Sequence, residues 1–154
     1  MKTPESIVRF LSGSRIAVAG VSRDNKHVGN VVLRKLRASG YEVLPIHPNA
    51  AEIEGIRCYP DLASIDGPID GLFIATRPQV AADLVRQCAD RGVPRVWLHR
   101  SIGHGSVSTE AIRECETSGI ECIAGGCPMM FCEPVDIGHR CLRWVMRLGR
   151  RPLP

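Results

Sequence analysis

The chain has 154 residues, of which 44% are hydrophobic, 23% charged and 5% aromatic, and its formal net charge is +4. This balance is typical of one globular domain with an aliphatic core, and it argues against a disordered protein. No apolar run is long enough to cross a bilayer, and Lys2, Glu5 and Arg9 interrupt the stretch where a signal peptide would be apolar. We therefore expect a cytoplasmic protein without a membrane partner, forming a single domain over residues 1–154 with its core between about 14 and 148.

Short apolar runs and helical patterns alternate from residue 15 onward. The run RIAVAG at 15–20 predicts a buried parallel strand that ends at a glycine. Residues 28–39 place valines and leucines on one helical stripe, and Gly40 follows as a stop signal, so a helix is expected there. The run YEVLPI at 41–46 predicts a second strand, with Pro45 tolerated where its missing donor faces away from the ladder.

The rest of the chain repeats this alternation after a looser connection at 50–68, which is expected to hold a short strand-like piece and then one helical turn. In the helix expected over 78–91, Val80 is expected to face the core. The remaining elements, in chain order, are expected to be a strand over 69–76, a helix over 78–91 ended by Gly92, a strand over 95–99, a helix over 108–118, a strand over 120–124 and a last helix over about 135–148.

Strands that alternate with helices at this spacing pair in parallel through right-handed crossovers. The predicted fold class is therefore α/β, a Rossmann-like doubly wound sheet of about five parallel strands with helices on both faces. In such sheets a ligand lies outside the carboxyl ends of the strands, where the strand order reverses, here beside the first strand.

The first candidate binding loop is GVSRDNKHVG at 20–29, where the first strand passes into the first helix. Helix-start amides and the helix dipole favour phosphate, and Ser22, Arg23 and Lys26 add hydrogen bonds and charge to the backbone of Gly20 and Val21. A solvated turn is the alternative interpretation. The loop is neither G-x-G-x-x-G nor a P-loop, so the standard NAD fingerprint is absent.

The second strand ends in His47, Pro48 and Asn49 instead of the Asp or Glu that grips the ribose hydroxyls of NAD. His47 and the basic residues nearby suit an extra phosphate on the ribose. NADP and coenzyme A both carry such a phosphate, so these residues favour either cofactor over NAD.

A third loop, Ala75, Thr76, Arg77 and Pro78, follows the third strand and places proline at the favoured first position of a helix. Thr76 and Arg77 can reach an anion from there. The alternative interpretation is that Thr76 caps the helix and Arg77 is solvated.

The chain has seven cysteines, and four of them, together with His139, fall between residues 122 and 141. An odd count without an export signal predicts thiols or metal ligands in place of disulfides. The C-x₄-C spacing fits a zinc site poorly, so we expect no metal. Cys127, in the turn after the fifth strand, is a candidate reactive thiol in the cofactor cleft if helix dipoles lower its pKa.

The histidines do not predict a catalytic site, and the C-terminal arginines do not predict a nucleic-acid site. His99 and His104 are neighbours in sequence, but spacing alone assembles no catalytic arrangement around them, so the catalytic residues stay unknown. The arginines at 140, 143, 147, 150 and 151 are explained by the dipole of the last helix, so no nucleic-acid partner is expected.

Taken in order, the segments IAVAGVS, YEVLPIHPNA, CYPDLASI, GLFIATRP and GGCPMM resemble the CoA-binding domain proteins related to the nucleotide-binding domain of the succinyl-CoA synthetase α-subunit. The resemblance implies coenzyme A held by its nucleotide end. It carries contacts over to Gly20, Val21, Ser22, Pro48, Asn49, Ala75, Thr76, Arg77 and Pro78.

The resulting expectation is a non-catalytic binding or regulatory module for coenzyme A or an acyl-CoA, with a homo-oligomer left open. The alternatives are a redox or thiol- or acyl-transfer enzyme that uses Cys127, and an NADP-binding protein.

Overall fold

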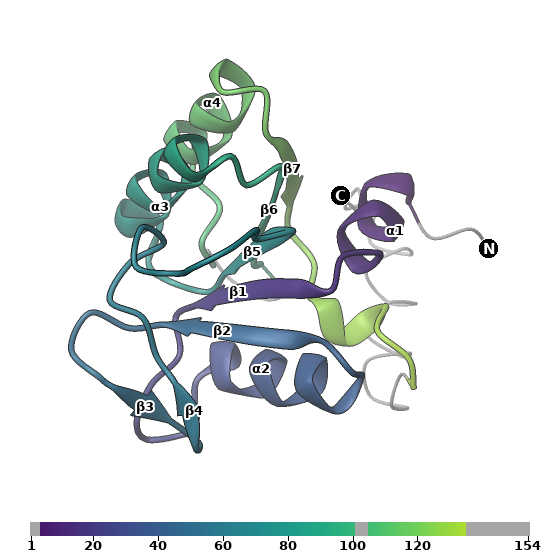
Figure 1. Ribbon diagram of the computed structural model, residues 1–154. Helices are drawn as coiled ribbons and strands as arrows, with labels where there is room; N and C mark the ends of the chain where they lie inside the picture. Colours follow the sequence, from purple (N-terminus) through teal and green to yellow (C-terminus); the bar gives the residue numbers. More distant parts are fainter. Residues whose placement is uncertain (1–3, 101–104, 135–154) are drawn as a thin grey trace.

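The computed structural model of the protein describes residues 4–100 and 105–134 (Figure 1). Five parallel strands form one sheet in the order β2-β1-β5-β6-β7, which confirms the predicted Rossmann-like α/β fold. The strands are β1 (Arg15–Ala19), β2 (Glu42–Ile46), β5 (Gly71–Ile74), β6 (Arg95–Leu98) and β7 (Glu121–Ala124). Because β2 lies on one side of β1 and β5 on the other, the strand order reverses beside β1, as expected.

The predicted helices between the strands are α2 (Val28–Ala38), α3 (Pro78–Arg91) and α4 (Thr109–Thr117), followed by the 3₁₀ turn η1 (Pro128–Met130). The bounds of α3 are those predicted, with proline at its start and Gly92 in the left-handed conformation (φ 66°) at its end. Ser108 caps α4 by accepting a hydrogen bond from the Ala111 amide at 3.1 Å. The helix expected over about 135–148 lies outside the described residues.

The core has two layers because successive residues of each buried strand face opposite sides of the sheet. In β1, Ala17 and Ala19 face α3 and α4, whereas Ile16 and Val18 face α2 and the N-terminal helix. Figure 1 shows the same division, with α3 and α4 together over one face and α2 over the other. Helices therefore cover both faces, as the doubly wound prediction requires.

The N-terminal helix α1 (Glu5–Leu11) was not predicted from the sequence. Its Ile7 and Phe10 are fully buried, and the Phe10 ring meets the Trp97 ring edge-on at 5.4 Å between centroids. Gly71 makes room for this contact, since a Cβ there would lie 2.7 Å from a carbon of the Phe10 ring. The hydrophobic core thus includes Ile7 and Phe10 of α1.

The connection after β2 differs from the expectation of one strand-like piece and one helical turn. It forms a small antiparallel hairpin of β3 (Glu52–Ile53) and β4 (Ile56–Arg57), and no helix forms between residues 50 and 68, all of which the structure describes. Glu54 and Gly55 turn the hairpin with φ values of 52° and 76°, the pair of positive angles that a tight two-residue turn requires.

The starts of β1 and β5 are joined by the Asp70 carboxylate. Its Oδ2 accepts hydrogen bonds from the Ser14 amide at 2.7 Å, the Arg15 amide at 2.9 Å and the Ser14 hydroxyl at 3.2 Å. The Arg15 amide, followed by the Ser14 amide, holds the pKa of Asp70 below its usual value because each donor favours the charged carboxylate.

We expect Asp70→Asn to lower the free energy of unfolding by about 1 kcal/mol at about pH 7, because a neutral acceptor binds these amides less strongly. A carboxylate with a lowered folded pKa stabilises the fold above its unfolded pKa, and this contribution is lost as the pH falls through the folded value. Urea titrations at about pH 7 and about pH 3 should therefore show a smaller difference between the two proteins at the lower pH. Asp66→Asn is the control, and an equal loss in both variants would contradict the assignment.

Candidate functional site

The strands β1, β2 and β5 end at the same level of the sheet. Ala19 pairs with Ile46 on one side and with Ile74 on the other. The first residues beyond these ends, Gly20, His47 and Ala75, therefore emerge side by side. This places the three loops predicted to bind the cofactor together at one edge of the sheet.

Two glycines allow the backbones to approach closely at this edge. Gly20 has a φ of 96°, and a Cβ on it would lie 2.5 Å from the carbonyl carbon of Ala75. A Cβ on Gly29 would lie 2.6 Å from the carbonyl carbon of Gly20 and 2.9 Å from the Val21 amide nitrogen. The start of α2 is thus pressed against the end of β1, which aims the first turn of the helix at the loops.

The loop after β1 is held by Asn30, a fully buried residue of α2 that sequence reasoning missed. Its Oδ1 accepts a hydrogen bond from the Ser22 amide at 2.7 Å, and its Nδ2 donates to the Ser22 carbonyl at 2.8 Å and to Glu54 Oε1 at 2.9 Å. Arg34 also donates to Glu54 Oε1 at 2.6 Å. The hairpin turn between β3 and β4 therefore helps to fix the loop conformation. An asparagine on the stripe of valines in this helix is the one sequence signal for the role.

Two adjoining cavities open at the carboxyl ends of these strands, with volumes of about 410 Å³ and 440 Å³. Each lies in the usual size range of a small-molecule site. They share five lining residues, Gly20, Val21, His47, Thr76 and Val80. The first is otherwise lined by Ala19, Ile46, Pro48, Pro60, Asp83, Leu84 and Gln87, and the second by Ser22, His27, Ala75 and Arg77.

The predicted site residues divide into those that line the cavities and those that stand beside them. The lining set is Gly20, Val21, Ser22, His47, Pro48, Ala75, Thr76 and Arg77. Of the others, Pro78 begins α3, Lys26 is exposed, and the Arg23 guanidinium donates to the carbonyl of Asn49. Arg23 and Asn49 thereby link the loop after β1 to the loop after β2.

His47 lines both cavities, and one of its ring nitrogens already takes part in a hydrogen bond within the protein. The Asn49 amide donates to His47 Nδ1 at 3.1 Å. Because a backbone N–H can only donate, Nδ1 acts as the acceptor and the neutral ring carries its proton on Nε2. His47 thus has an N–H donor left for a ligand.

The start of α3 differs from the alternative interpretation in which Thr76 caps the helix. Arg77 occupies the N-cap position, no side chain caps the helix, and the Thr76 hydroxyl donates to the Arg77 carbonyl at 3.2 Å. The Arg77 guanidinium is exposed and has no hydrogen bond or ion pair with any other residue that the structure describes. The first turn of α2 likewise has no side-chain cap on its N-cap residue, His27. Two helix starts therefore border the second cavity, together with a guanidinium that has no partner among the described residues.

Val80 was expected to face the core, but its side chain is 38% exposed and lines both cavities. The inward face of α3 is formed by Ala81, Leu84, Val85 and Cys88. Val80 lies one turn from Leu84 on the side of the helix that borders the site, where a ligand can cover it.

Cys127 does not line either cavity. It is 3% exposed, packs in the core layer that contains Trp97 and Met130, and burial raises the pKa of its thiol to about 11. This is opposite in direction to the lowered pKa that a reactive thiol in a cofactor cleft requires. Burial also lowers the pKa of His99, whose Nδ1 has no partner among the described residues.

The structure bears on the expectations about metals and membranes only for the described residues. Within residues 4–100 and 105–134 no cluster of three metal-binding side chains occurs. His104, His139 and Cys141 lie outside the described residues. No helix in the described part of the chain has the length and apolar character needed to span a membrane.

Comparison with known proteins places this geometry in a family. Residues 14–133 match the family described as CoA binding domain. The uncharacterized protein YneT of Bacillus subtilis is 28% identical over 105 residues, which cover 68% of this chain and 75% of that protein. A hypothetical protein from Pyrococcus horikoshii OT3 has a similar structure, with a TM-score of 0.74, 27% identity, and coverage of 82% of this chain and 87% of that one.

A larger enzyme carries a related segment. The α subunit of ADP-forming acetate–CoA ligase II from Pyrococcus furiosus is 28% identical over 106 residues, which cover 68% of this chain but 23% of that subunit. The likeness therefore concerns one part of the ligase subunit. Because the family match extends over far more than half of the chain, this protein belongs to the family of CoA binding domains.

Proposed function

We propose that this protein binds coenzyme A or an acyl-CoA at the two cavities beside β1, β2 and β5, with the nucleotide phosphates in the second cavity. The observation that carries the proposal is the set of anion-binding features there. Two helix starts without side-chain caps and the Arg77 guanidinium, which has no partner among the described residues, border the same hollow. His47 adds an N–H donor and Ser22 a hydroxyl.

The proposed role is that of a binding or regulatory module. The alternative of an enzyme with a Cys127 nucleophile finds no support in the site, because the thiol is buried outside both cavities and its pKa is raised. A thiol that is protonated at neutral pH and shielded from the cofactor is a weak nucleophile. Sequestration or sensing of coenzyme A requires only the binding geometry described above.

Arg77→Ala is expected to weaken coenzyme A binding by at least about tenfold, because a charge-assisted hydrogen bond to phosphate is lost. Calorimetric titration measures the change. The matched control is Arg37→Ala, since Arg37 is also exposed but lies in the last turn of α2, at the other end of the sheet from the cavities. Unchanged affinity in Arg77→Ala, or an equal loss in both variants, would remove Arg77 from the proposed site.

A further inference from the structure

The first cavity has a polar feature that the second does not share. Asp83 and Gln87 line it, and among the described residues that line the first cavity alone they are the only two with hydrogen-bonding side chains. They lie four residues apart on α3, so they occupy the same face of the helix. The other described residues that line the first cavity alone are apolar, and Ile46, Pro48 and Leu84 are among them.

The orientation of the Gln87 amide is fixed by its partner. The Leu62 amide donates to Gln87 Oε1 at 3.1 Å, and a backbone N–H can only donate, so the oxygen of the side chain must face Leu62. The Nε2 group has no acceptor among the described residues. Gln87 therefore turns its oxygen toward Leu62 and offers the two N–H groups of Nε2 to a ligand in the first cavity.

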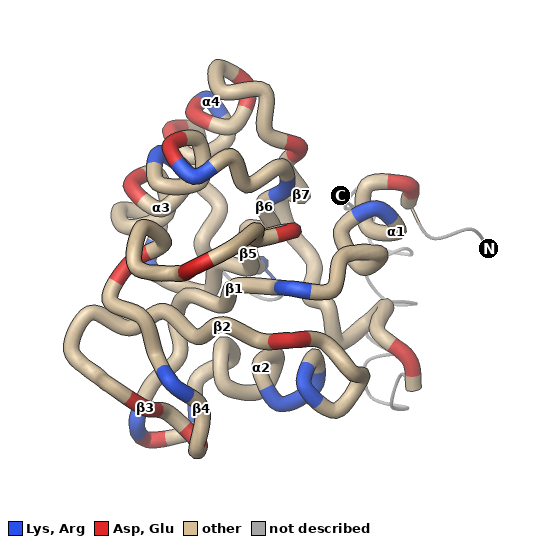
Figure 2. Tube along the Cα trace, viewed as in Figure 1, with Lys and Arg blue, Asp and Glu red and all other residues tan. Residues whose placement is uncertain are grey.

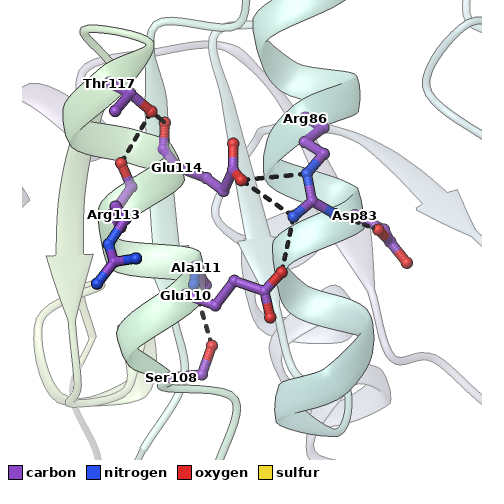
Figure 3. A network of polar contacts seen from close by, with 8 residues as sticks. All are labelled: Asp83, Arg86, Ser108, Glu110, Ala111, Arg113, Glu114 and Thr117. Atoms are coloured by element: carbon purple, nitrogen blue, oxygen red, sulfur yellow. Dashed lines mark hydrogen bonds and ion pairs between the residues drawn. The ribbon is translucent and has the colours of Figure 1, made fainter.

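Asp83 provides the complementary group. Its Oδ1 accepts a hydrogen bond from Arg86 at 2.6 Å, and Arg86 is in turn held by Glu110 at 2.7 Å and Glu114 at 3.0 Å. Figure 3 shows this network between α3 and α4, with Asp83 on the side away from α4. Figure 2 shows acidic and basic residues interspersed over these two helices, as the ion pairs require. The second oxygen of Asp83, Oδ2, has no donor among the described residues and remains an acceptor.

We propose that the first cavity holds the base of the bound nucleotide and selects a 6-aminopurine, with Asp83 accepting from the exocyclic amine and Gln87 Nε2 donating to N1. This assignment rests on the proposed function. Adenine presents a donor at position 6 and an acceptor at N1, which is the pattern complementary to an Asp83 oxygen and a Gln87 N–H. A 6-oxopurine presents an acceptor at position 6 and an N–H at N1, so it opposes both side chains.

The walls of the cavity suit a flat apolar ring. Ile46 ends β2 and Pro48 lies in the loop after it, whereas Val80 and Leu84 belong to α3. The two sets therefore border the same space from different elements. A base between them covers the exposed Val80 side chain. The phosphates then extend into the second cavity, which adjoins the first along the lining residues that both cavities share.

The test compares coenzyme A with its analogue in which hypoxanthine replaces adenine, by calorimetric titration of the full chain. The unaltered protein is expected to bind coenzyme A at least about tenfold more tightly, because the analogue leaves two hydrogen-bonding groups opposed. Equal affinities would overturn base selection while leaving the proposed function standing. Binding of neither ligand would contradict the proposed function and this assignment together.

Gln87→Glu tests the donor directly. A glutamate can still accept from the Leu62 amide, but its second oxygen accepts from the N1–H of hypoxanthine and repels N1 of adenine. The affinity ratio of the two ligands is therefore expected to fall by at least about tenfold. Gln79→Glu adds the same charge to α3 at an exposed position outside both cavities and should keep the original ratio. An unchanged ratio in Gln87→Glu, with an unchanged thermal unfolding midpoint, would overturn the role of Gln87.

Discussion

Gly20→Ala is expected to abolish measurable coenzyme A binding and to lower the free energy of unfolding by roughly 2–4 kcal/mol. Two effects add at this position. The φ of 96° is one that residues with a Cβ rarely adopt, and the new Cβ would lie 2.5 Å from the Ala75 carbonyl carbon. The obstructing atoms belong to the backbone, so β1 and β5 must separate where the two cavities meet. Urea unfolding and calorimetric titration measure the two consequences.

Gly40→Ala separates these two effects. Gly40 has nearly the same φ, 92°, but nothing lies within 4 Å of a Cβ built there. This variant is expected to lose only the conformational part, about 1–2 kcal/mol, and to bind coenzyme A normally. If Gly20→Ala binds as well as Gly40→Ala, the close approach of the two loops is not needed for the site.

Asn30→Leu is expected to lower the free energy of unfolding by roughly 2–4 kcal/mol and to weaken coenzyme A binding strongly. A leucine of similar shape makes none of the three hydrogen bonds of Asn30, so the Ser22 amide, the Ser22 carbonyl and the Glu54 carboxylate each lose a partner in a partly buried setting. The loop after β1 then loses the hydrogen bonds that tie Ser22 to α2. Urea unfolding gives the stability, and titration of the folded variant gives the affinity.

A double-mutant cycle tests whether Glu54 belongs to the same hydrogen-bond network as Asn30 and Ser22. Asn30→Asp turns a carboxylate oxygen toward Glu54, and Glu54→Gln then replaces that like charge with an amide that can donate. The double variant is expected to be more stable than the sum of the single effects predicts, by about 1 kcal/mol. Strict additivity would contradict the proposed link between the hairpin turn and the loop.

Local patterns were sufficient to predict the sheet and the three loops that meet at its carboxyl edge. The apolar run before Gly20, with proline at residue 78 and glycine at residue 92, marks element boundaries through backbone preferences that act within a few residues. Parallel pairing then brings the loops after β1, β2 and β5 to one edge whatever their side chains are. This is why eight predicted residues line the cavities.

The features that were missed depend on contacts between distant segments. Helix α1 is positioned by the Phe10 contact with Trp97, and the amide of Gln87 is oriented by Leu62. Neither contact leaves a periodic signal in the sequence. Val80 shows the same limit, because an apolar residue beside a cavity and one in the core have the same chemistry, and only the direction of α3 separates them.

The most direct test of the account is calorimetric titration of the full chain with coenzyme A, NADPH, NADH and ATP. Saturable binding of coenzyme A in preference to the other three is expected, since the proposed site offers Arg77, His47 and the helix starts to its phosphates and Asp83 and Gln87 to its base. Binding of none of the four, or tighter binding of NADPH than of coenzyme A, would contradict it.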